Sequence, residues 1–395
     1  MAKLISNRIY LDYNATSPLA DSVKEYLARG DFSYGNASSM HMEGRNSRRL
    51  IIESKDYLFD LFSLEKEKFE IFFHSGATEA LNSIVKGLAM HATSQKKQAH
   101  FFYSTVDHSS VVKQALHLPW LGHKAHACPV DNNGQLLVDK LIQDILKVTG
   151  PDSIVLFNFT QVNNETGVVW PLQIAAEIKK RTGCLVHVDA VQAPGKITGW
   201  NNLNFALDAY TYSAHKFGAM KGVGFTFISD HFPWIPLHAG GGQQKGLRSG
   251  TENVLGIYSI KLALIELINN FDCARLLKMK LRLESTIKSL LPERVIIVGE
   301  NAPYRNANTT NVVIKKSKSD SLVSAFDLKG IAVSTGSACS TGASVPSRIL
   351  LEMGLSEEFA KQALRFSLPP NITDQEIEGT EKVMNVIFSS LFQAP

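Results

Sequence analysis

The chain has 395 residues, of which 41 are Lys or Arg and 37 are Asp or Glu, giving a formal net charge of +4. So small an excess, without a basic block, argues against direct nucleic-acid binding, because that binding needs clustered cations. No apolar run reaches the ~18–20 residues of a membrane span, and no signal-peptide core stands near the start. We therefore expect a globular, cytoplasmic protein that does not enter a membrane.

The four cysteines, Cys128, Cys184, Cys273 and Cys339, form no C-x-x-C pair. Their spacing gives little support to a zinc site or a thioredoxin-like pair, so we expect no metal. Few, scattered cysteines are typical of a protein from a reducing compartment.

Short β-rich runs alternate with helical patterns through the first two-thirds of the chain. Apolar residues at helical spacing predict a helix over 78–91. This alternation favours an α/β domain with a mostly parallel sheet, in which ligands bind at the carboxyl ends of strands. The predicted strands are 69–73, 99–103, 153–157, 185–188, 209–212 and 223–228.

The last third has a different pattern. A long helical stretch is predicted from about 253 to 291. A smaller α+β unit follows, with strands near 295–298 and 311–314 and helices near 347–353 and 373–392.

A small-residue turn follows the first predicted strand. The pentapeptide Ser-Gly-Ala-Thr-Glu at 75–79 opens a helix, where free backbone N–H groups attract phosphate and Gly76 permits close approach. Taken alone, this pattern is more typical of an ordinary helix start with a hydroxyl cap.

Two charged residues follow later strands. Asp189 ends a hydrophobic strand, where a carboxylate needs either a cationic partner, such as a pyridinium N–H, or a helix to cap. Lys216 follows the next strand among small residues and would form a Schiff base if its pKa were lowered, although a lone Lys is usually a solvated charge. Ser213 and His215 beside it are candidate phosphate donors. Together, in this order, the phosphate loop, Asp and Lys meet the needs of a pyridoxal phosphate site.

With these residues in view, the sequence resembles the cysteine desulfurases of the NifS/IscS kind, within the class V aminotransferase group of fold-type I pyridoxal phosphate enzymes. The resemblance implies a large cofactor-binding domain over 16–260, with a mostly parallel seven-stranded sheet flanked by helices. It implies a smaller α+β domain made of 1–15 and 261–395. The landmarks that carry it are 10–16, 35–41, 75–79, 107–108, 162–167, 187–192, 213–216, 240–243, 248–251, 336–339 and 365–367.

The resemblance also implies roles for the cofactor site. Lys216 would hold pyridoxal phosphate and move the substrate Cα proton, and Asp189 would pair with the ring nitrogen. His108 would stack on the ring and exchange the thiol proton, although a lone His is more often structural. The other implied cofactor-binding residues are Gly76, Ala77, Thr78, Asn164, Gln192, Ser213 and His215, joined by Thr251 from the second subunit of a homodimer.

For the substrate, the resemblance implies that Arg365 and Asn36 bind the carboxylate of L-cysteine, with Asn164 alongside. A guanidinium binds a carboxylate in a bidentate manner, although Arg365 could instead form a surface or interface ion pair.

Cys339 lies among small and polar residues, which predicts an exposed loop. Free cysteines are more often buried and inert, and we expect this of Cys128, Cys184 and Cys273. The resemblance places the catalytic cysteine at Cys339, in a mobile loop of about 334–346, where its thiolate is the nucleophile.

The implied reaction converts L-cysteine to L-alanine through a pyridoxal phosphate ketimine and leaves a persulfide on Cys339. The persulfide would pass to a protein acceptor, a scaffold or a sulfurtransferase, in iron–sulfur cluster assembly, tRNA thiolation or another sulfur-transfer pathway. An alternative is a selenocysteine lyase, or another class V transaminase or lyase, that does not use Cys339. A non-catalytic sulfur carrier is disfavoured by the intact Lys216, Asp189, His108 and Cys339.

Overall fold

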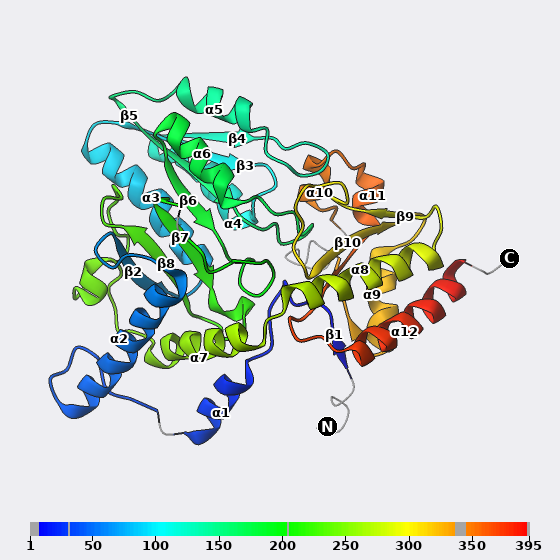
Figure 1. Ribbon diagram of the computed structural model, residues 1–395. Coiled ribbons are helices and arrows are strands. Elements are labelled where there is room, and N and C mark those ends of the chain that lie inside the picture. The colour runs from blue at the N-terminus through cyan, green and yellow to red at the C-terminus, as the bar shows by residue number, and fades with distance from the viewer. Residues whose placement is uncertain (1–7, 31, 204, 336–344, 393–395) are drawn as a thin grey trace.

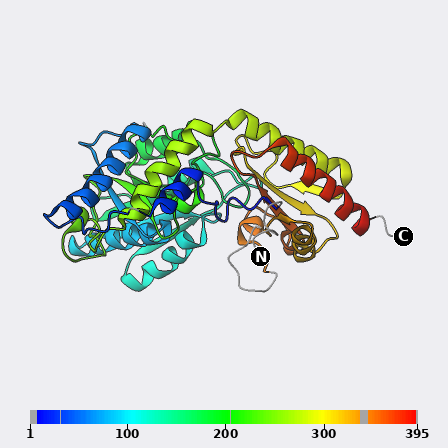
Figure 2. The same cartoon turned by 90° about the horizontal axis from the view of Figure 1, so that it is seen from below.

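The computed structural model describes residues 8–30, 32–203, 205–335 and 345–392 (Figure 1). A large sheet with its helices and a smaller sheet with its helices lie side by side. The chain passes from the first part to the second through α7 (Val254–Asn270) and α8 (Cys273–Leu290), as Figure 2 shows from below.

The large sheet has seven strands, and all but one run in the same direction. The exception is β8, which lies antiparallel between its two neighbours. In spatial order the strands are β2 (Phe69–His74), β8 (Gly224–Ser229), β7 (Ala209–Ser213), β6 (Leu185–Asp189), β5 (Ser153–Thr160), β3 (Gln98–Ser104) and β4 (Lys124–Cys128).

The predicted α/β fold with a mostly parallel sheet is confirmed, as are the six predicted strands. The sequence pattern missed β4. This edge strand reads Lys-Ala-His-Ala-Cys, with no β-branched residue, so it carries little of the usual strand signal.

Helices cover both faces of the large sheet because successive strand residues point to opposite sides. Ile71 and Phe73 belong to one core, whereas Phe72 between them belongs to another. The first face is covered by α2 (Met42–Phe62), α5 (Val138–Leu146), α6 (Leu172–Thr182) and α7, with α1 (Asp21–Arg29) beside α7. The second is covered by α3 (Ala77–Ser94) and α4 (Ser109–His117).

The predicted helical stretch of 253–291 is divided. Phe271 and Asp272 separate α7 from α8, and the two helices meet at 76°. Asp272 starts α8 by accepting the Arg275 N–H at 2.9 Å, as an N-cap does. Within the described residues, no single helix is long and apolar enough to cross a membrane. Among these residues, only α7 and α8 taken together, which are bent relative to each other, have the length and apolar composition of a span.

The smaller part has an antiparallel sheet in the order β12 (Ala363–Ser367), β10 (Thr309–Ile314), β9 (Val295–Ile297). A parallel pair joins β1 (Ile9–Tyr10) to β11 (Ile331–Ala332). The helices here are α8, α9 (Ser319–Leu328), α10 (Arg348–Glu352), α11 (Glu357–Lys361) and α12 (Asp374–Phe392). The sequence pattern predicted β9, β10, α10 and α12 but not β12 or α9.

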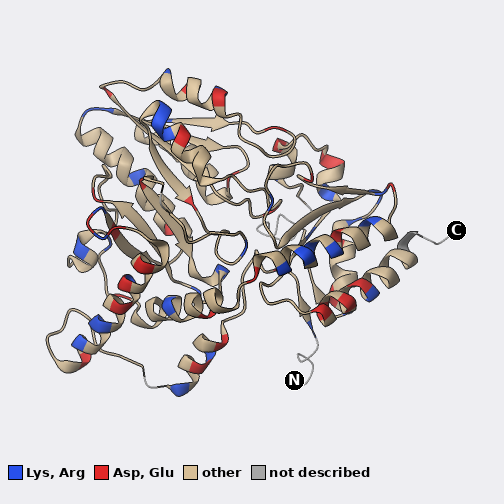
Figure 3. Ribbon diagram, viewed as in Figure 1, with Lys and Arg blue, Asp and Glu red and all other residues tan. Residues whose placement is uncertain are grey.

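A separate apolar core fills this smaller part, and it includes Leu11 near the N-terminus as well as Leu283 and Phe366. The predicted boundaries of two domains remain a prediction. Charges of both signs are interspersed on α2, α8 and α12 (Figure 3), and Arg282 of α8 pairs with Glu381 of α12 at 2.6 Å.

Candidate active site

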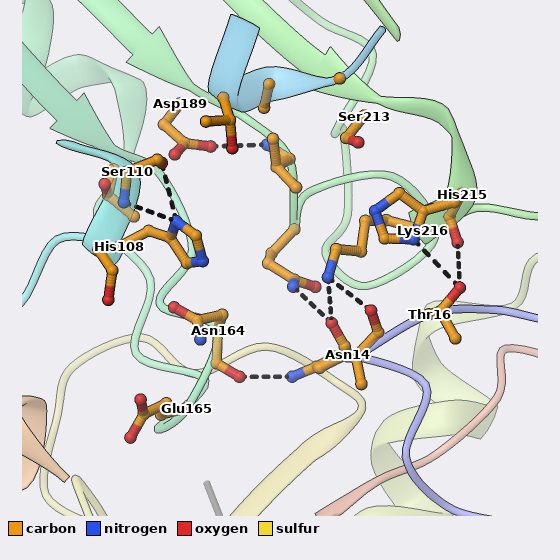
Figure 4. Close-up of a pocket in the computed structure, with 18 of the residues that line it drawn as sticks. Asn14, Thr16, His108, Ser110, Asn164, Glu165, Asp189, Ser213, His215 and Lys216 are labelled. Atoms are coloured by element: carbon orange, nitrogen blue, oxygen red, sulfur yellow. Dashed lines mark hydrogen bonds between the residues drawn. The ribbon is translucent and has the colours of Figure 1, made fainter. Parts of the chain in front are cut away.

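A cavity of about 780 Å³ lies at the carboxyl ends of the large-sheet strands (Figure 4). Its walls come from the turn before α3, the start of α4, the ends of β5, β6 and β7, and the N-terminal segment. Arg365 of β12 and residues around α10 close it from the smaller part. This volume lies within the range of cofactor and small-molecule sites.

One side of the cavity is rich in hydrogen-bond donors. The first turn of α3 begins at Ala77 and Thr78, and N–H groups in a first turn have no acceptor within their helix. A Cβ added to Gly76 would lie 3.8 Å from Ser213 Oγ, so the missing side chain leaves space between this turn and β7. His215 adds its ring, with Nδ1 3.1 Å from Thr16 Oγ1. Such a donor set suits a phosphate.

Lys216 reaches into the cavity from the end of a short 3-10 turn that follows β7 (Figure 4). Its Nζ donates to the carbonyls of Asn14 and Ala15 at 2.7 and 2.8 Å. These contacts with neutral groups, some 200 residues away in sequence, hold the amine in place. The supporting role of Asn14 and Ala15 was not predicted, although they lie in the landmark 10–16.

Asp189 ends β6 and is 7% exposed. Burial raises its pKa to about 6, against the opposing effects of the Val191 N–H and Lys216. A cation bound to this carboxylate would stabilise its charged form. Asp189 therefore suits a protonated ring nitrogen.

His108 is the N-cap of α4. Its Nδ1 accepts the Ser110 N–H at 3.2 Å, so a neutral ring carries its proton on Nε2. Burial, together with the charges of Lys216 and Arg348, lowers the pKa of His108 to about 4. At neutral pH this ring is an uncharged donor at Nε2.

Gln192 and Arg365 line the cavity from different parts of the fold. Gln192 Nε2 donates to the Asn14 carbonyl at 3.0 Å, and its Oε1 accepts from buried Lys196. Arg365 donates to Asp12 Oδ1 at 2.6 Å and to the Asn164 carbonyl at 3.1 Å. Its Nε is buried without a partner among the described residues.

Asn36 and Thr251 do not line this cavity, and both are exposed. Asn36 Oδ1 accepts the Ser38 N–H at 2.9 Å. Cys339 lies outside the described residues. Eleven of the predicted site residues line the cavity: Gly76, Ala77, Thr78, His108, Asn164, Asp189, Gln192, Ser213, His215, Lys216 and Arg365.

Sequence reasoning missed Glu165 and Arg348, which also line the cavity. Glu165 is 8% exposed and accepts from Ser347 at its carboxylate. Arg348 donates to the carbonyl of Asp107, immediately before His108. Glu165 lies in the landmark 162–167, which is its signal, whereas nothing in the sequence marks Arg348.

The cavity residues fit pyridoxal phosphate. Donors for a phosphate, a buried carboxylate for the ring nitrogen and an amine for the aldehyde converge on one space. Among the residues that the structure describes, no group of three or more His, Cys, Asp and Glu is placed to hold a metal ion.

Comparisons with known proteins agree with this site. The family "aminotransferase class V" matches residues 9–379. A cysteine desulfurase of Cereibacter sphaeroides is 34% identical over 97% of this chain and 96% of its own length. A solved NifS-like protein has a TM-score of 0.84 and 30% identity over 98% of this chain and all of its own. A structure of SspA in complex with cysteine has a TM-score of 0.76 and 25% identity over 93% of this chain and 100% of its own.

The family match spans most of the chain, and the curated relative covers nearly all of it. The members of this family use pyridoxal phosphate, for which the cavity supplies every required group. The chain therefore belongs to the NifS/IscS-like cysteine desulfurases of the class V aminotransferase family.

Proposed function

We propose that this chain converts L-cysteine to L-alanine and transfers the sulfur through Cys339. The observation that carries this proposal is the single cavity that holds Lys216, Asp189 and the donors of the α3 N-terminus, with Arg365 at its edge. The bound pyridoxal phosphate supplies an electron sink for a substrate that is joined to it.

On the cofactor side, Asp189 would hold the ring nitrogen of pyridoxal phosphate, and Gln192 and Asn164 would bind its ring hydroxyl. Ala77, Thr78, Ser213 and His215 would hold the phosphate. Lys216 Nζ, which donates to the carbonyls of Asn14 and Ala15, removes the Cα proton of the substrate and returns it later.

On the substrate side, Arg365 binds the carboxylate of L-cysteine. Its guanidinium is oriented by Asp12 and the Asn164 carbonyl, and its buried Nε has no partner among the described residues. An incoming carboxylate would supply one. His108, which lines the cavity, exchanges the proton of the substrate thiol through Nε2.

Cys339 is proposed as the sulfur acceptor within the chain. Its thiolate attacks the sulfur of L-cysteine, an S–S bond forms and the Cβ–S bond breaks. The electron pair of the broken bond stays with the carbon product, which is protonated and leaves as L-alanine. Cys339 keeps the sulfur as a persulfide, a reversible modification that an acceptor protein can remove.

A homodimer completes the proposed site. Asn36 and Thr251 carry proposed roles, yet both are exposed and lie outside the cavity of their own chain. Near Asn36, Tyr34 and Met40 are 85% and 87% exposed, as expected of residues that a second subunit covers. The protein that receives the sulfur, in iron–sulfur cluster assembly, tRNA thiolation or another pathway, would dock elsewhere.

The first test is intact mass spectrometry of the loaded enzyme after brief exposure to L-cysteine without reductant, followed by peptide mapping. One added sulfur atom on Cys339, removed by dithiothreitol, is expected. Cys339→Ser should lose this gain, whereas Cys273→Ser, which removes a partly exposed cysteine of α8, should keep it. L-alanine formed at the wild-type rate by Cys339→Ser would instead favour a lyase that does not use this thiol.

A further inference from the structure

A row of buried polar side chains crosses the large sheet directly beneath the cavity. It lies on the face that packs against α3, where Phe72, Leu156 and Ile228 form part of an apolar core. None of these side chains is more than 4% exposed. On four strands the polar residue stands two positions before one that lines the cavity: His74 before Gly76, Asn158 before Thr160, His187 before Asp189, and Thr211 before Ser213.

The row forms one continuous chain of hydrogen bonds, completed by Thr226 on β8 and Asp107 after β3. It spans six of the seven strands or the turns that follow them. Its links are His74 Nε2 to Thr226 Oγ1 (3.0 Å), Thr226 Oγ1 to Thr211 Oγ1 (2.9 Å), Thr211 Oγ1 to His187 Nε2 (2.8 Å), His187 Nδ1 to Asn158 Oδ1 (2.8 Å) and Asn158 Nδ2 to Asp107 Oδ2 (3.0 Å).

The direction of this chain follows from its end at Asp107. Asp107 Oδ2 accepts the backbone N–H of Ser104 at 3.0 Å, so it is an acceptor and Asn158 must present its NH₂ group to it. Asn158 Oδ1 then faces His187, whose Nδ1 must carry a proton.

The donor and acceptor at each remaining link follow from His187. It is buried, and among the described residues its two nitrogens bond only to Asn158 and Thr211; burial lowers its pKa to about 3. The ring is therefore neutral and its Nε2 accepts from Thr211. Thr226 must then donate to Thr211, and His74 to Thr226. Every donor in the chain points toward the Asp107 carboxylate.

Asp107 in turn is joined to the cavity wall. Its backbone N–H donates to the Ser104 carbonyl at 3.0 Å, which closes the turn leading into His108. Thr160, which lines the cavity, donates to its Oδ1 at 2.6 Å. Burial raises the pKa of Asp107 to about 7, while the hydrogen bonds from Thr160, Asn158 and Ser104 oppose this and the charge of Asp189 adds to it.

We propose that the aligned chain holds Asp107 as a buried carboxylate, and that Asp107 is a positioning residue for the proposed reaction. It fixes the turn that carries His108, and its negative charge, close to that of Asp189, favours the protonated form of the bound cofactor. Aligned hydrogen bonds strengthen one another, so even its remote members contribute. This inference rests on the proposed function only for where the cofactor binds.

The direction of the chain is tested by ¹⁵N NMR of histidine-labelled full-length protein, with and without pyridoxal phosphate. His187 is expected to carry its proton on Nδ1, and His74 on Nε2. If His187 carried its single proton on Nε2, the proposed direction of the hydrogen-bond chain would be wrong. Since this readout needs no catalysis, it stands even if the protein does not release sulfur from cysteine.

The effect on the cofactor is tested by following the visible absorption of the loaded enzyme against pH. A negative charge stabilises the protonated cofactor. Asp107→Asn should therefore lower, by about half a pH unit or more, the midpoint of the absorption change that reports loss of the cofactor's proton. Asp107→Glu keeps the charge, so its midpoint should lie close to that of the wild type. An unchanged midpoint in Asp107→Asn would refute the proposal.

A second pair of variants keeps the test decisive if Asp107→Asn does not fold. Thr226→Val breaks the chain at a buried residue that does not line the cavity, and it should lower the midpoint by a smaller amount. Thr226→Ser keeps the hydroxyl and should leave the midpoint unchanged. Equal midpoints in both would refute the coupling, whereas a protein without any visible band would instead count against the proposed function.

Discussion

The two regions that meet at the cavity contribute to it differently. The large sheet supplies Asp189 and Ser213 from the ends of neighbouring strands and Lys216 from the turn just beyond, all within 28 residues of sequence counted inclusively from 189 to 216. The smaller sheet supplies Arg365, which is oriented by Asp12 from a remote segment. The large sheet forms a compact cofactor site, whereas Arg365 of the smaller sheet is a cation held by contacts with remote segments. Substitutions at the large-sheet residues should therefore affect the bound cofactor, whereas a substitution at Arg365 should affect only the binding of substrate.

The largest effect is expected at Lys216. Lys216→Ala removes the amine that we propose joins the cofactor and moves the Cα proton, so turnover should fall by roughly 10³-fold or more. Borohydride should then fail to fix the cofactor to the protein, as measured by intact mass. Lys221→Ala, in a lysine that lines the same cavity, is the matched control and should still be labelled. Labelling of Lys216→Ala at the wild-type level would contradict the assignment.

A smaller loss is expected at Asp189. Asp189→Asn keeps the shape of the side chain but removes the charge that we propose holds the ring nitrogen protonated, so kcat should fall on the order of 10²-fold. The visible spectrum of the bound cofactor should change in the same variant. A wild-type spectrum together with a wild-type kcat would show that this carboxylate only caps the chain at Val191.

Arg365 should separate the two regions. Arg365→Lys keeps the charge but cannot form bidentate hydrogen bonds with the substrate carboxylate, so KM for L-cysteine should rise about 10- to 100-fold. The absorption spectrum and the affinity for pyridoxal phosphate should stay as in the wild type. Loss of the cofactor in this variant would mean that the smaller sheet supports the cofactor site as well.

The smallest effect concerns stability against pH in the cofactor-free protein. The pKa of Asp189 is raised from 3.8 to about 6 by burial, so its stabilising contribution is full below pH 4 and is lost as the pH rises through 6. Wild type should lose on the order of 2 kcal/mol relative to Asp189→Asn between these values. Thermal unfolding of both proteins at pH 4 and pH 7 measures this, and parallel curves would contradict it.

The prediction from sequence was strongest where chemistry and secondary structure coincide locally. Asp189 and Lys216 each stand at or just after the end of an apolar strand, and the parallel alternation of strands and helices brings such ends to one edge. It failed at β4, because a short edge strand of small and polar residues lacks the apolar run. It also missed Arg348, whose place depends on how α10 packs near the start of α4 and not on any local pattern.

The sequence by itself determined the alternation of strands and helices over most of the large sheet, the family, and the identity of the groups that a pyridoxal phosphate site needs. Only the tertiary structure decided that the Asn14 and Ala15 carbonyls hold Lys216 and that Asp12 orients Arg365. The same holds for the chain of hydrogen bonds from His74 to Asp107. The physical reason is that a buried polar group must find its partner wherever the fold places one, and these partners lie far apart in sequence.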